Sequence, residues 1–219
     1  MATRTKLTEA ESLEMYRVSL ENATKQPQIQ AILTKLGYDT AVIEEGKALL
    51  SQTRKAYDFN RIEDDETSAA YAHFSKLKEE VEDLFNIHRK IAKVIFRKDP
   101  VTADQLSISG PIPRTYMKWL ESAKIFYGVA ATDQDVLNKL GRLKLGAADI
   151  ANGNTLINEL ETARSEYLRE KGESQDATKL KDAAFSKIRD WMSDFYEVAK
   201  IGLEDNPQLL ESLGKMVRS

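Results

Sequence analysis

FSKLKEEVEDLFNIHRKIAKVI, residues 74–95, is the stretch that decides the fold class. Apolar residues and one histidine recur there at alternating steps of three and four. This spacing places them on one face of an α-helix for about three heptads. The positions are Phe74, Leu77, Val81, Leu84, His88, Ile91 and Ile95. A second series predicts another long helix at Phe185, Ile188, Met192, Phe195, Ala199 and Leu203. We expect the large apolar members to be buried, namely Phe74, Leu77, Val81, Leu84, Phe185, Ile188, Met192 and Phe195.

The rest of the chain is also predicted to be helical, because the chain has only 10 glycines and 5 prolines to end helices or punctuate strands. Thr8 and Glu11 form a capping-box pattern at the first helix, and Asp39 and Asp133 are expected N-caps. We expect a hairpin turn at residues 63–66 and a helix break at Gly172. The predicted class is all-α, with long antiparallel helix pairs.

The order of these segments recurs, which predicts an internal duplication. The segment His73–Phe85 aligns without a gap to Ala184–Tyr196, with four of 13 positions identical and six more conservative. Shorter matches occur in the same order, including residues 30–37 with 134–141 and residues 92–100 with 199–207. Copies of about 107 residues are too long for solenoid repeats. We therefore expect two copies of a helical-bundle unit, each with about four to five helices, related by a pseudo-two-fold axis.

The predicted organisation is a first helical repeat at residues 1–109, a linker at residues 110–114 and a second repeat at residues 115–219. The linker prediction rests on the glycine and two prolines that precede Arg114. The two repeats could form two domains or pack as one.

Composition excludes several classes of protein. The chain has no cysteine, so it forms no disulfide and no thiolate metal site. No secretory signal and no apolar run of membrane-spanning length is visible, which predicts a soluble, cytoplasmic protein with no membrane association. The net charge of -3 does not favour nucleic-acid binding, although a basic cluster lies at Arg89, Lys90, Lys93, Arg97 and Lys98.

Motifs for known chemistry are missing from the sequence. No Glu-x-x-His pair of a di-iron bundle, Gly-rich phosphate loop or Gly-x-Ser-x-Gly is present. We predict no cofactor, no metal ligand and no catalytic residue. His88 is the candidate for a ligand pocket, because it occupies a seam position that a heptad gives to an apolar residue. The preferred interpretation, for His88 and likewise for His73, is a histidine at the core edge, whose polar tip reaches a carboxylate, a backbone carbonyl or solvent.

The function that these features favour is a non-catalytic helical interaction or structural protein, with a protein partner or self-association. The alternative is a small-molecule-binding protein or an enzyme with a pocket between the two repeats. Whether the protein is an enzyme is left open, with the non-catalytic interpretation preferred.

Overall fold

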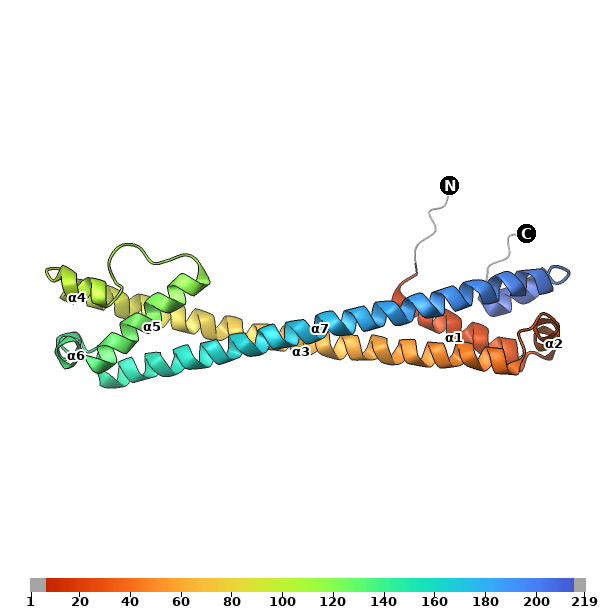
Figure 1. The fold of residues 1–219 in the computed structure, drawn as a ribbon, viewed down its shortest axis with the longest axis horizontal. Helices are drawn as coiled ribbons and strands as arrows, with labels where there is room; N and C mark the ends of the chain where they lie inside the picture. The colour runs from red at the N-terminus through yellow and green to blue at the C-terminus, as the bar shows by residue number, and fades with distance from the viewer. Residues whose placement is uncertain (1–6, 215–219) are drawn as a thin grey trace. The chain divides into compact units, whose positions relative to one another are not determined.

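A computed structural model describes residues 7–214, which form helices and no strand (Figure 1). The helices are, in chain order, α1 (Glu9–Lys25), α2 (Pro27–Lys35), α3 (Thr40–Ile95), α4 (Pro100–Gln105), α5 (Tyr116–Thr132), α6 (Gln134–Gly141), α7 (Ala147–Gly202) and the 3-10 helix η1 (Pro207–Leu213). The prediction of an all-α protein is confirmed. Within residues 7–214, no helix combines the length and the apolar character that crossing a membrane requires.

Two predicted interruptions are wrong, because α3 and α7 are each one continuous helix of 56 residues. The expected turn at residues 63–66 lies inside α3, where glutamate is a good helix former and aspartate is only mildly unfavourable. The expected break at Gly172 lies inside α7. A glycine in a helix interior costs about 1 kcal/mol, which the packed turns on either side of it outweigh.

The predicted helix caps are confirmed. The Thr8 hydroxyl accepts a hydrogen bond from the Glu11 N–H, while the Glu11 carboxylate accepts one from the Thr8 N–H at 2.7 Å. Asp39 accepts from the Val42 N–H at 3.0 Å and thereby caps the start of α3. Asp133 accepts from two backbone N–H groups at the start of α6.

The described chain divides into two compact units. Unit 2 is residues 65–172, and unit 1 combines the described residues before and after it. Unit 1 contains α1, α2, the first part of α3, the last part of α7 and η1. Unit 2 contains the remainder of α3 and α7 together with α4, α5 and α6. Each unit therefore takes elements from both of the halves that the sequence predicts as repeats.

In unit 2, α3 and α7 run antiparallel and α5 packs on both. Thr67 of α3 donates to the Glu170 carbonyl of α7, and the ring of Phe74 stacks on that of Tyr167. Phe85 of α3 contacts Phe126 of α5, with ring centroids 5.7 Å apart. The fully buried members of this core include Phe85, Leu106, Ala123, Phe126, Tyr127, Leu140 and Leu160.

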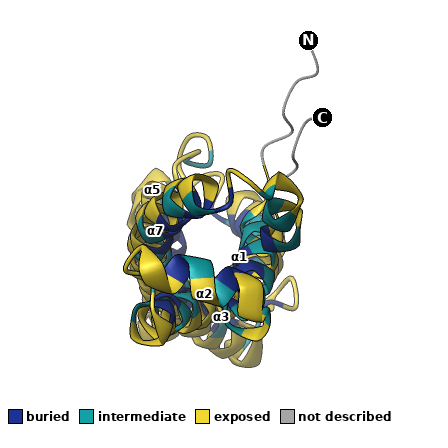
Figure 2. Cartoon of the chain, turned by 90° about the vertical axis from the view of Figure 1, so that its right-hand side faces the viewer, coloured by how far each residue is buried: buried dark blue, intermediate teal, exposed yellow. Residues whose placement is uncertain are grey.

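Unit 1 has a separate apolar core, in which α1 and α2 pack against its parts of α3 and α7. Figure 2 shows that α1, α2 and α3 turn their buried residues inward and their exposed residues outward. Members of this core include Leu20, Ile29, Leu33, Ile43, Ile188, Phe195 and Leu213.

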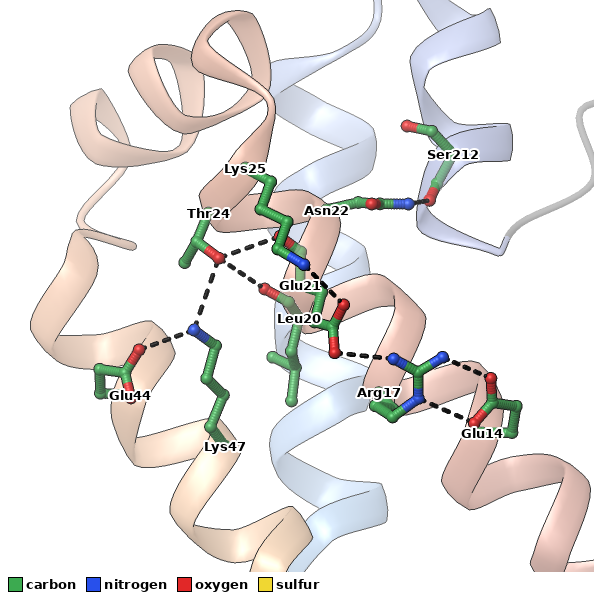
Figure 3. Close-up of polar contacts among 10 residues, drawn as sticks. All are labelled: Glu14, Arg17, Leu20, Glu21, Asn22, Thr24, Lys25, Glu44, Lys47 and Ser212. Atoms are coloured by element: carbon green, nitrogen blue, oxygen red, sulfur yellow. Dashed lines mark hydrogen bonds and ion pairs between the residues drawn. The ribbon is translucent and has the colours of Figure 1, made fainter.

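Polar contacts fasten the end of α1 to its neighbours in unit 1 (Figure 3). Asn22 donates to the Ser212 carbonyl of η1 at 2.7 Å, and Lys47 of α3 reaches the Thr24 hydroxyl at 3.4 Å. Arg17 pairs with Glu14 and Glu21 on the outer face of α1. These pairs lie at the exposed surface, where solvent screens them, so the apolar core supplies most of the stability.

The predicted core is supported by the burial of its members. Five of the eight are buried, namely Val81, Phe185, Ile188, Met192 and Phe195, while Phe74, Leu77 and Leu84 are half-buried. None is exposed, so the predicted helix phase is close to the observed one. Phe85, which was not on the predicted face, is fully buried and lies between α3 and α5.

Candidate functional site

A groove runs along the surface of unit 2 between α3 and α7. Its larger hollow has a volume of about 400 Å³, and an adjoining hollow of about 310 Å³ shares His73 and Glu166 with it. The lining of the first is His73, Leu77, Thr155, Asn158, Glu159, Thr162, Ala163 and Glu166. The lining of the second adds Glu66, Ala69, Ala70 and Glu170. We call these residues together the unit 2 groove.

The groove follows from the spacing of its residues on two helices. On α3 they lie at positions 66, 69, 70, 73 and 77, and on α7 at positions 155, 158, 159, 162, 163, 166 and 170. Steps of three and four residues form one stripe on each helix. The floor is low because Ala69, Ala70 and Ala163 carry only a methyl group. The α7 stripe extends over about 22 Å at 1.5 Å per residue.

The chemistry of the groove is acidic. Glu66 stands on α3, while Glu159, Glu166 and Glu170 stand on α7. Glu66, Glu159 and Glu166 are exposed, as is the His73 ring. Carboxylates in this arrangement accept hydrogen bonds from ammonium or guanidinium groups, and charge-assisted bonds of this kind are among the stronger polar contacts.

Glu170 differs from the other groove carboxylates because it is only 8% exposed. One of its carboxylate oxygens pairs with Arg169, whose own side chain is 55% exposed. The other oxygen, Oε2, is buried and has no hydrogen-bond partner among the described residues. A buried carboxylate oxygen without a donor is costly, so this atom is a site at which a ligand's N–H group would be stabilising.

His88, the candidate from the sequence, lies in the core of unit 2 and outside this groove. It is 6% exposed, and its Nδ1 is 2.9 Å from the hydroxyl of the fully buried Tyr127. Burial lowers the pKa of His88, and the negative charge of Asp149 opposes that shift. Burial likewise raises the pKa of Tyr127. The partner is thus a tyrosine hydroxyl, and not the predicted carboxylate, backbone carbonyl or solvent.

The predicted basic cluster divides into a buried and an exposed part. Arg89 is 5% exposed and donates to the carbonyls of Ile108 and Gly110, both at 2.9 Å. Lys93 donates to the Gly110 carbonyl at 2.7 Å. Burial lowers the pKa of both cations, and the charge of Arg89 lowers that of Lys93 further. Arg89 and Lys93 therefore hold residues 108–110, which lead into the predicted linker, against α3.

The groove residues were missed by sequence reasoning, apart from His73. The chain has 35 acidic residues, so no pair of carboxylates stands out. One signal in the sequence is the spacing of three glutamates on one face of α7, which lie seven and then four residues apart at Glu159, Glu166 and Glu170. The pairing of that stripe with residues 66–77 depends on how α3 and α7 align, which local sequence does not encode.

Comparison of the chain with known protein families, curated proteins and solved structures finds no match.

Proposed function

We propose that this is a non-catalytic helical interaction protein, which binds a partner protein in the unit 2 groove. The single observation that carries the proposal is the form of the groove: an open trough along two helices, lined by exposed polar side chains over a floor of alanines. Sites for small molecules are enclosed and mostly apolar. A trough between helices instead suits a partner's helix laid along it.

The surroundings of the histidines support a non-catalytic role. A general base must reach a substrate proton. His88 is enclosed in the core and bonded to Tyr127, so its ring contributes to packing. His73 is exposed in the groove, where it is a surface group available to a partner.

The test is site-specific photo-crosslinking with the full chain in the cells that produce it. A benzoylphenylalanine replaces Ala70 on the groove floor, and the matched control replaces Ala72, an exposed residue outside the groove lining. We expect a discrete crosslinked protein from position 70 and none from position 72. Equal crosslinking from both positions, or none from either, would contradict the proposal.

A second candidate function is the binding of a small molecule, with or without catalysis. It is favoured by the hollow of about 400 Å³, to which the two predicted repeats both contribute: His73 and Leu77 come from the first, and Glu159 and Glu166 from the second. A screen of metabolites by thermal shift, repeated on Glu166→Gln, tests it. A stabilising compound whose effect depends on Glu166 would favour this candidate over the first.

We also propose that the chain arose by duplication. The lengths of corresponding helices support this: α1 and α5 both have 17 residues, and α3 and α7 both have 56. Helix α3 begins at residue 40 and α7 at residue 147, a shift of 107 residues that also relates α1 to α5 and α4 to η1. Duplication of a single helical unit explains both the equal lengths of the corresponding helices and the constant shift between them.

Backbone details support the same shift of 107 residues. Positive φ values occur at Gly37 and Lys144, and again at Ser107 and Gly214. The constant shift of 107 residues favours one uniform alignment of the two halves. The sequence matches differ from one another in their offsets, so they do not all fit this alignment. The pairing of Phe74 with Phe185 is then four residues, about one helical turn, out of step.

Building a chain that carries residues 115–219 twice, joined by residues 110–114, tests the equivalence of the two halves. We expect a helical monomer by circular dichroism and size-exclusion chromatography. An unfolded or aggregated product would contradict the duplication and the pseudo-two-fold relation predicted from it.

A further inference from the structure

The unit 2 groove has an excess of negative charge. Within the described residues, Glu66, Glu159 and Glu166 form no ion pair and accept no hydrogen bond. Two positive groups nearby already have partners: Arg164 lies over the Tyr116 ring at 4.1 Å, and Arg169 pairs with Glu170 of the groove. A ligand that enters the groove therefore meets carboxylates with free acceptor capacity.

The carboxylates follow the length of the groove. Glu166 and Glu170 are four residues apart and lie one turn apart on the same face of α7, and Glu159 lies about two turns before Glu166. Glu66 of α3 lines the same hollow as Glu166 and Glu170. The distance along the axis from Glu159 to Glu170 is about 16 Å, so acceptors occur on both edges of an elongated trough.

The buried Oε2 of Glu170 is the second, independent feature that points to a ligand. Glu170 lines the hollow and is nine-tenths buried, and its Oε2 has no donor among the described residues. Exposed carboxylates are satisfied by water, but a buried oxygen gains most from a donor supplied by a bound molecule. A cationic donor would also offset the desolvation of the carboxylate.

The floor of the groove determines the shape of the occupant. Ala69, Ala70 and Ala163 leave room for a close approach, and helix axes pack at about 8–10 Å according to the side chains between them. Leu77 adds an apolar contact at one end. A helix of about 15 residues would fill the length of the α7 stripe.

We propose that the unit 2 groove binds a basic amphipathic helix of a partner protein, which places lysine or arginine side chains along both edges. One of these cations donates to Oε2 of Glu170, and others pair with Glu66, Glu159 and Glu166. The small or apolar face of the helix lies on the alanine floor. This inference rests on the proposed function and names the chemistry of the partner.

The experiment measures fluorescence anisotropy of labelled helical peptides with the full chain at low ionic strength. The probe is a peptide of about 15 residues, built from alanine, leucine and lysine so that lysines flank an alanine-rich face. The companion probe carries glutamate in place of every lysine. The groove variant is Glu166→Gln with Glu170→Gln. The matched control is Glu79→Gln with Glu121→Gln, which removes the same charge from exposed residues outside the groove lining.

We expect the lysine peptide to bind and the glutamate peptide not to bind. The groove variant should weaken the lysine peptide roughly tenfold or more, the control should change its affinity less than about twofold, and added salt should weaken binding. Ala69→Tyr, which fills the floor, should also abolish binding, while Ala72→Tyr should not. Circular dichroism of each variant checks that the fold is retained.

Three results would overturn the inference: no binding of the lysine peptide, equal binding of the glutamate peptide, or equal weakening by the groove and control variants. The crosslinking test separates this failure from that of the proposed function. A protein crosslinked at position 70, together with a lysine peptide that does not bind, would leave the groove as an interaction surface and reject a basic helix as its partner.

Discussion

Replacing Gly153 of α7 by alanine should destabilise the protein, although alanine is the better helix former. A Cβ atom on Gly153 would overlap the ring carbons of Tyr127, which is fully buried and bonded to His88. Alanine for glycine in a helix interior gains about 1 kcal/mol. Forcing extra volume into a packed core costs about 1–3 kcal/mol, and losing the bond between Tyr127 and His88 costs about 1 kcal/mol more. The net loss is about 1–3 kcal/mol.

Gly172→Ala is the matched control, since it lies in the same helix and a Cβ there meets no atom within 4 Å. It should gain about 1 kcal/mol, which raises the midpoint of thermal unfolding by about 2–4 °C for a chain of this size. Urea unfolding followed by circular dichroism compares the two variants. Combining Gly153→Ala with Tyr127→Leu should recover at least about 0.5 kcal/mol relative to the sum of the single changes. If Gly153→Ala proves as stable as Gly172→Ala, the assigned contact between Gly153 and Tyr127 is wrong.

Three further predictions concern single positions. Stability should fall as the pH drops below about 6.5, because the lowered pKa of His88 in the folded protein makes the unfolded chain bind a proton at higher pH. When the free energy of unfolding is measured across pH, its slope against pH should be smaller in His88→Phe. Lys144→Gly should stabilise by about 0.5–1 kcal/mol, measured by thermal unfolding, because Lys144 holds a φ of 63° that glycine adopts without steric cost. Arg89→Met should cost about 1–3 kcal/mol in urea unfolding by leaving the Ile108 carbonyl without its donor, while Lys90→Met should change stability by less than about 0.5 kcal/mol; equal losses would refute the role of Arg89.

The helices and their caps could be predicted from the sequence because their causes are local. Side chains at steps of three and four define one face, and the partners of Thr8 and Asp133 are within three residues of them. The continuity of α3 and α7 could not be predicted this way. Whether residues 63–66 and Gly172 remain helical depends on packing outside the local window, and that packing outweighed their modest propensity costs.

The site was less predictable than the fold. A seam position identified His88, but its partner Tyr127 is 39 residues away in sequence and on another helix. The groove depends on the alignment of α3 with α7, and Glu170 becomes distinctive only through its burial. Acidic residues on helices are usually solvated, so neither composition nor spacing separates these carboxylates from the others.

The division into units also sets an order of events during synthesis. Unit 2 is one continuous segment, whereas the two parts of unit 1 are separated by residues 65–172. At about 5–20 residues per second, a ribosome needs roughly 5–20 s to make that segment. During this time the apolar faces of α1, α2 and the start of α3 lack their packing partner, because the last part of α7 has not yet been synthesised. The nascent chain thus exposes the apolar faces of its first helices while unit 2 is completed.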